Sequence, residues 1–164
     1  MMAGKRDMSD KGNNFRTMKK LFALFLCFCS FSLAHGQDID WTKTHDWKIY
    51  LISKFGEMYK VSIDSLSRYD SANIGQPAMM QYLQNVSKLP KGTYYWHGGY
   101  LCTAKIDSAE TIKVFVSQDD GSLLVMPGHV HYAIPEGQRQ KWLSYMHKNW
   151  IQLAENHRKK GNRG

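Results

Sequence analysis

Alternating hydrophobic and polar residues predict a series of short strands in the second half of the chain. The clearest example is residues 110–117, where Ile112, Val114 and Val116 occupy every second position. A period of two is typical of a strand that buries one face. Further strands are expected at residues 93–106 (with a bend or bulge at Gly98-Gly99), 122–126 and 129–134, with turns at 119–121 and 127–128. Short consecutive strands joined by tight turns predict an antiparallel meander.

Two more strand patterns precede this region. Residues 47–53 are rich in bulky side chains that favour strands, and residues 58–66 alternate, with Tyr59, Val61 and Ile63 opposite polar neighbours. Only a short segment containing Gly56 separates them. The pattern therefore predicts a hairpin.

Hydrophobic residues at three- and four-residue spacing predict two helices. The first covers residues 77–88 and begins at Pro77, a residue well suited to the first position of a helix. The second covers residues 136–157, where Trp142, Met146 and Trp150 repeat every four residues. Together the patterns predict an α+β fold, in which an antiparallel sheet of five or six strands (a hairpin, then a meander) carries both helices on one face.

The fold is preceded by a segment with the features of a secretory signal peptide. Within residues 18–36, Lys19 and Lys20 precede a hydrophobic run of 13 residues, and Ala34 and Gly36 occupy the positions that signal peptidase reads. A transmembrane anchor needs about 20 hydrophobic residues, so this run is too short to be one. We expect cleavage before Gln37, with residues 1–17 as an upstream extension outside the fold.

Residues 37–164 are then expected to form a single α+β domain, either periplasmic or extracellular. The short Met-Lys-Lys start at residue 18 resembles that of a bacterial signal peptide. After cleavage we expect no stable insertion into the membrane.

Charge argues against a nucleic-acid partner. The full chain has a formal net charge of +8, but residues 37–164 contain 16 Lys and Arg against 12 Asp and Glu. Four of these basic residues fall in the last seven positions, and the remaining body is neutral. A nucleic-acid-binding domain would instead spread basic residues over one face. We expect a basic, frayed and solvated C-terminus.

Cys102 is the only cysteine downstream of the signal peptide, so no internal disulfide can form. It lies in a hydrophobic strand pattern, where we expect a buried, unreactive thiol. A nucleophilic pair of Cys102 with His97 is therefore a weak alternative, because a reactive thiolate needs partial exposure.

Three histidines form the candidate metal site. His129 and His131 are two positions apart in a predicted strand, so their side chains would share one face, and His97 could lie on a neighbouring strand. Three imidazoles on one face could hold zinc and leave a position open for water. The alternative is that all three are ordinary surface residues of the sheet, and no other cofactor is expected.

Aromatic residues form the candidate binding surface. Within residues 93–96 side chains should alternate, so Tyr94 and Trp96 would face one way and Tyr95 the other, with Tyr100 nearby. Tyrosine and tryptophan are favoured at recognition surfaces, and they also fill cores between a sheet and its helices. One set is expected on the sheet face that the helices leave open.

Three functions remain compatible with this sequence. The first is a non-catalytic binding protein with a protein partner in the cell envelope or outside the cell, such as an inhibitor, an immunity-type protein or an envelope accessory protein. The second is a metal-binding protein or metal-dependent hydrolase that uses the histidines. The third is a carrier of a small apolar or carbohydrate ligand. Phosphate-binding glycine loops, serine-hydrolase elbows and paired cysteine motifs are absent from the sequence, so we favour the first.

Overall fold

The computed structural model describes residues 38–92, 94, 96–107 and 110–162. The predicted signal peptide at 18–36 and the extension at 1–17 lie outside the described residues. The chain divides into two units, residues 1–37 and residues 38–164. The second unit has its own hydrophobic core. In the described part of the chain, no helix has both the length and the hydrophobicity needed to cross a bilayer.

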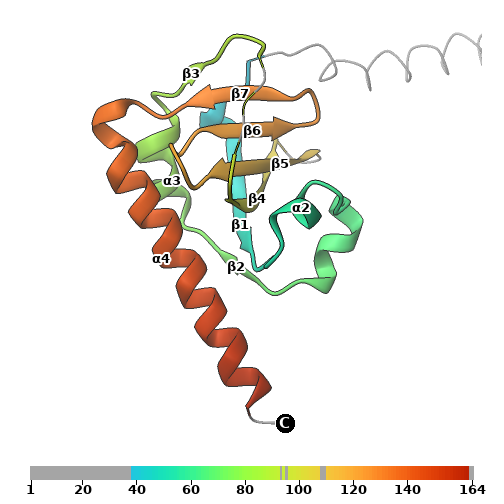
Figure 1. Cartoon of the computed structure of the whole chain (residues 1–164). Coiled ribbons are helices and arrows are strands. Elements are labelled where there is room, and N and C mark those ends of the chain that lie inside the picture. Colours follow the sequence, from blue (N-terminus) through green and yellow to red (C-terminus); the bar gives the residue numbers. More distant parts are fainter. Residues whose placement is uncertain (1–37, 93, 95, 108–109, 163–164) are drawn as a thin grey trace, which may run out of the picture. The chain divides into compact units, whose positions relative to one another are not determined.

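The centre of the domain is a mixed-length antiparallel sheet of seven strands, in the order β2-β1-β4-β5-β6-β7-β3 (Figure 1). Its strands are β1 (Thr44–Tyr50), β2 (Ser71–Asn73), β3 (Ser87–Lys88), β4 (Gly99–Ile106), β5 (Glu110–Ser117), β6 (Leu123–Met126) and β7 (Val130–Ala133). The predicted meander is present as β4 to β7, in which each strand pairs with the next. The two shortest strands, β2 and β3, lie at the edges and raise the strand number above the predicted five or six.

The predicted strand at residues 58–66 is wrong. This region instead forms a short helix α2 (Phe55–Met58) and a 3-10 helix η2 (Ile63–Arg68). Ser62 caps η2, because its side chain accepts a hydrogen bond from the backbone N–H of Ser65. The strand that pairs with β1 on its outer side is β2, not residues 58–66, and β4 pairs with β1 on its inner side.

Two longer helices pack on the same face of the sheet, as predicted (Figure 1). Helix α3 (Gln76–Leu83) has Pro77 in its first turn but ends earlier than expected, before β3. Helix α4 (Glu136–Gly161) continues beyond the expected end at residue 157. The basic residues at positions 158–160 lie in the last turns of this helix.

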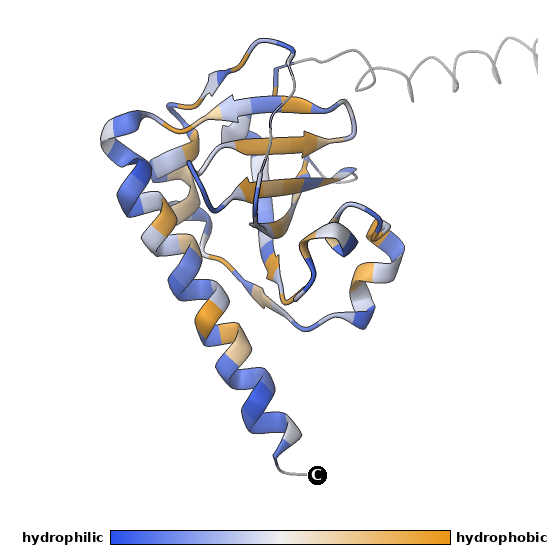
Figure 2. Ribbon diagram, viewed as in Figure 1, coloured by the Kyte–Doolittle hydropathy of each residue, from blue (hydrophilic) through white to orange (hydrophobic). Residues whose placement is uncertain are grey.

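Each face of the sheet has a separate hydrophobic core. The larger core joins the sheet to α3 and α4 through Met79, Leu83, Trp142, Met146 and Leu153. The smaller core lies on the other face, under α2 and η2. The central strands are accordingly hydrophobic on both sides, and Figure 2 shows β4, β5 and β6 largely in hydrophobic colours. A small second core was not anticipated from the sequence, and it covers only part of the face that was expected to be open.

Candidate functional site

The face of the sheet opposite α4 carries one continuous row of side chains across five strands. Adjacent strands pair in register at the positions that form this row. Because neighbouring strands lie about 4.8 Å apart, side chains in such a row contact one another directly. From β1 to β7 the row consists of Tyr50, Leu101, Phe115, Leu124 and His131.

Helices α2 and η2 cover the β1 and β4 end of this row. Met58 and Leu66 from these helices are 3 % exposed and pack against it. Lys113 on β5 fastens the connecting loop to the sheet, because its Nζ donates a hydrogen bond to the carbonyl of Val61 at 2.9 Å. Burial of this ammonium group lowers the pKa of Lys113. At the β5, β6 and β7 end of the row, a different set of side chains packs on the sheet.

The first group of exposed aromatic rings stands over β5. The ring of Tyr59, just after α2, stacks on Phe115 with 4.7 Å between centroids, and Phe55 meets Tyr59 edge-on at 5.2 Å. Phe115 is fully buried, whereas Tyr59 is 40 % exposed and is one of the few large hydrophobic side chains exposed in the described residues. Partial burial raises the pKa of the Tyr59 phenol, so it stays neutral and can donate a hydrogen bond at physiological pH.

The second group stands over β7. The ring of Tyr94 stacks on His131 with 4.1 Å between centroids, and Trp96 meets His131 edge-on at 6.0 Å. The Tyr94 hydroxyl donates to the carbonyl of Pro90 at 2.6 Å, which fixes the ring in place. Tyr94, Trp96 and His131 are all half-buried, and Trp96 also packs against the smaller core.

We call Tyr59, Tyr94, Trp96 and His131, with Phe115 beneath Tyr59, the aromatic surface. Its two groups are separated by Leu124, which lies between Phe115 and His131 in the row. Met126 on β6 is half-buried at the same end of the sheet and packs against the smaller core. The result is an aromatic and partly exposed area built on three paired strands, which gives it a rigid support.

The sequence predicted only part of this surface. Tyr94 and Trp96 are on it, and Tyr95 lies outside the described residues. Tyr100 is not on it, because this residue is 3 % exposed and points into the core under α4. There its hydroxyl forms a 3.0 Å hydrogen bond with Nδ1 of His147. The sequence analysis did not place Tyr59 on this surface, because residues 58–66 were expected to form a strand. In the structure Tyr59 directly follows helix α2.

The three candidate metal ligands lie in three different settings. The Nδ1 atom of His97 is 3.2 Å from a carboxylate oxygen of Asp119, and the His97 side chain is 88 % exposed. His129 lies in the turn between β6 and β7 with a φ of 52°, so the strand alternation that would align it with His131 does not apply. Over residues 38–92, 94, 96–107 and 110–162, no three His, Cys, Asp or Glu side chains form a group that could hold a metal ion.

His131 has an unusual electrostatic position. Its Nδ1 atom is buried and has no hydrogen-bond partner within the described residues. Burial lowers the pKa of this imidazole, and the nearby charge of His129 lowers it further. His131 is therefore a neutral ring at pH 7 and contributes to the surface as an aromatic group.

Cys102 is buried, as the sequence predicted, on the sheet face that packs against the helices. Burial raises the pKa of its thiol far above the usual range, so the thiolate does not form at physiological pH. This setting gives no support to a nucleophilic role for Cys102.

Comparisons of the chain with protein-family models, with curated proteins and with solved structures give no match. The functional assignment therefore depends on the geometry of the aromatic surface and on the sequence.

Proposed function

We propose that this protein is an exported, non-catalytic binding protein whose aromatic surface contacts a protein partner in the cell envelope or outside the cell. One observation carries the proposal. Half-exposed aromatic rings stand in two groups on the sheet face opposite α4, each stacked on a side chain of the sheet. Rings held in this way offer a large contact area that loses little conformational entropy on binding.

The extent of the surface across three strands favours a macromolecular partner over a small ligand. Pockets for small ligands are typically concave and enclose most of the ligand. The aromatic surface instead follows a row of paired strands, with Leu124 between its two ring groups. A protein segment lying across β5, β6 and β7 can contact both groups at once. The export part of the proposal rests on residues 18–36 of the sequence.

Site-specific photo-cross-linking in the cells that produce the protein tests this proposal. A photoreactive amino acid replaces Tyr59 in one variant, Trp96 in a second and Gln140 in a control. Gln140 is exposed on α4, on the opposite face of the sheet. We expect the first two variants to capture the same protein and the Gln140 control to capture none of it. The mature N-terminus of the cross-linking variants themselves should be Gln37.

Four results would each contradict part of the proposal. Equal labelling at all three positions, or labelling at none, would mean that the aromatic surface is not a protein-binding site. A small molecule that co-purifies with the protein and is lost on Trp96→Ala substitution would favour the ligand carrier instead. A chain that keeps residues 18–36 and stays in the cytoplasm would contradict export.

A further inference from the structure

The excess positive charge of the domain is concentrated on helix α4. This helix contains six Lys and Arg against two Glu, a formal net charge of +4. All the other described residues together contain nine Lys and Arg against ten Asp and Glu, a formal net charge of −1. Most protein surfaces mix charges of both signs, so this separation gives α4 a field that attracts anions.

Three of the cations on α4 form a nearly straight row. Lys148 follows Lys141 by seven residues, which is about two helical turns, and Lys159 follows Lys148 by eleven, which is about three turns. All three side chains are exposed, whereas Trp142 and Met146 point from the helix into the core. We call Lys141, Lys148 and Lys159 the lysine row, and its length is about 27 Å at 1.5 Å per residue.

The lysine row is available to an anion outside the chain. No lysine of the row has an ion-pair or hydrogen-bond partner among the described residues. Asp70, just before β2, instead contacts His157 and Lys160, the latter at 3.6 Å from its Nζ atom. These contacts fasten the end of α4 to the edge of the sheet and leave Lys159 unpaired.

The helix dipole does not explain the lysine row. The dipole stabilises cations in the last turn of a helix, where Lys159 lies close to the C-terminal end. Lys141 lies in the second turn, near the positive end of the dipole, and Lys148 lies in the middle. Between Lys141 and Lys159 the only acidic residue is Glu155. The row therefore has little compensation within the helix itself.

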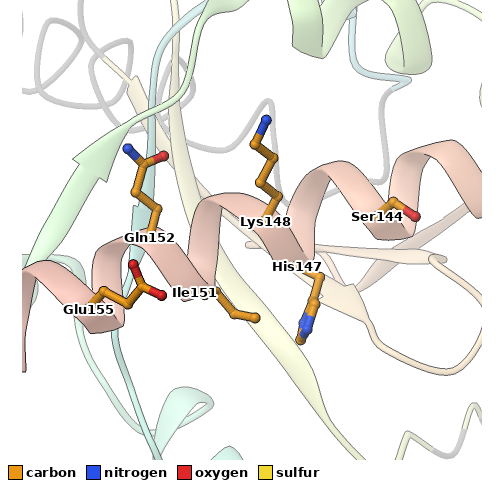
Figure 3. A pocket seen from close by; sticks show the side chains of 6 residues that line it. All are labelled: Ser144, His147, Lys148, Ile151, Gln152 and Glu155. Atoms are coloured by element: carbon orange, nitrogen blue, oxygen red, sulfur yellow. The ribbon is translucent and has the colours of Figure 1, made fainter.

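The surface around the lysine row is open. Two shallow depressions, of 630 and 420 Å³, adjoin along α4 and share Ser144 and Lys148 among their lining residues. Figure 3 shows Lys148 and Gln152 extending from the same side of the helix. A pocket for a small ligand encloses most of that ligand. The shape of this surface instead suits an extended anionic partner.

We propose that the lysine row binds the surface of a bilayer that contains anionic phospholipids. The two spacings in the row are about 10.5 and 16.5 Å, so they follow no common repeat. A bilayer presents anionic headgroups over its whole surface, so each lysine of a straight row meets one whatever the spacing. Duplex DNA carries its phosphates on two curving strands, and an acidic protein carries its carboxylates at fixed points. Clustered Lys and Arg on a helix are typical of anionic lipid binding.

The interaction is peripheral and reversible. The large hydrophobic side chains of α4, such as Trp142 and Met146, are buried in the core and do not enter the bilayer. Each lysine near an anionic bilayer raises the binding constant about fivefold. Salt weakens such binding, because the screening length falls from about 10 Å at 0.1 M to about 3 Å at 1 M. This inference does not depend on the proposed function, since the aromatic surface lies on the opposite face of the sheet.

Co-sedimentation with lipid vesicles tests the proposal. The protein is residues 37–164, the unit that holds the hydrophobic core, because the hydrophobic run at residues 21–33 would itself enter any bilayer. Vesicles of equal parts phosphatidylcholine and phosphatidylglycerol are compared with vesicles of phosphatidylcholine alone. We expect at least about tenfold tighter binding to the anionic vesicles at low salt. Raising the salt to about 1 M should abolish this difference.

Replacing the whole lysine row tests whether the row carries the binding. The triple variant Lys141→Gln, Lys148→Gln, Lys159→Gln should weaken binding to anionic vesicles at least about thirtyfold, because three attractive contributions are lost. The single variant Glu155→Gln should have the opposite effect. It removes the acidic residue within the row and should strengthen binding by about two- to fivefold.

A second triple variant is the matched control. Lys54→Gln, Lys60→Gln, Lys91→Gln removes three exposed lysines outside α4 and changes the net charge by the same amount. It should weaken binding by no more than about threefold, because these lysines do not face the bilayer. Circular dichroism establishes that every variant is folded before it is compared.

Three results would overturn the proposal. The first is equal binding of the wild-type domain to both kinds of vesicle. The second is an equal loss of binding in the two triple variants, which would mean that net charge and not the lysine row is responsible. The third is tighter binding to duplex DNA than to anionic vesicles with the same sensitivity to the lysine row, which would make the row a nucleic-acid site.

Discussion

At the scale of single residues, His131 combines two roles that oppose each other. Its ring is stacked under Tyr94 and supports the aromatic surface, yet its buried Nδ1 atom has no partner among the described residues. A buried nitrogen without a hydrogen bond destabilises the fold, and a protonated imidazole there would do so more strongly. The position therefore links the stability of the surface to pH.

Acidification should weaken the domain through this residue. The pKa of His131 in the folded protein lies below its ordinary value of 6.5, so between these two pH values the unfolded chain binds more protons. The free energy of unfolding should then fall as pH drops below about 6.5. We expect a lower urea midpoint at pH 5.5 than at pH 7.5.

The variant His131→Phe isolates the contribution of this ring. Phenylalanine keeps the stacking with Tyr94 but cannot be protonated, so the difference between the two midpoints should shrink. Carboxylates with lowered pKa values, such as Asp70 and Asp120, titrate below this range and contribute equally to both proteins. An unchanged pH difference in His131→Phe would mean that His131 does not cause it.

At the scale of elements, one contact sets how α4 meets the sheet. The turn between β5 and β6 contains Gly121, whose φ is 71° and whose carbonyl accepts a hydrogen bond from the indole N–H of Trp142 at 3.0 Å. A Cβ atom at this glycine would lie 2.7 Å from Cδ1 of Trp142. The turn therefore leaves no space for a side chain at position 121 beside Trp142, the first buried residue of α4.

The substitution Gly121→Ala should destabilise the domain by about 2 kcal/mol or more, because the new side chain meets both the left-handed backbone and the indole. Gly137, in the first turn of α4, is the matched control, since a Cβ there meets nothing within 4 Å. Gly137→Ala should stabilise the helix by about 0.5 kcal/mol. Urea unfolding measures both, and equal effects of the two substitutions would contradict this account.

The elements differed in how far their sequence patterns could be interpreted. Strand β5 matches the predicted residues 110–117, where Ile112, Val114 and Val116 recur at every second position, although its second half is buried on both faces. Residues 58–66 alternate just as well, but Met58 and Val61, three residues apart, point into the smaller core from a helix and the loop after it. Short amphipathic patterns fit either period, and tertiary packing decides between them. Helix α4 exceeded its predicted end because contacts with Asp70, distant in sequence, support its last turns.

The sequence likewise predicted only part of the candidate site. Tyr94 and Trp96 were expected on one face together, and both contact His131. Tyr100 was grouped with them because the strand was expected to begin at residue 93. The strand begins at Gly99, so the alternation from Tyr94 does not extend to Tyr100. A turn likewise separates His129 from the strand of His131, which the sequence did not reveal.

At the scale of the whole molecule, the described domain has two distinct outer faces. The aromatic surface lies over β5 to β7, and α4 covers the other side of the sheet. Six of the basic residues lie on α4.

The most direct test of the central claim is the affinity of the cross-linked partner, once purified, for the wild-type domain and for three variants. Trp96→Ala and Tyr59→Ala should each raise the dissociation constant at least tenfold, a loss of about 1.4 kcal/mol that is expected when a central aromatic anchor is removed. Gln140→Ala, on the opposite face, should leave it unchanged. Equal affinities for all four folded proteins would show that the aromatic surface is not the binding site.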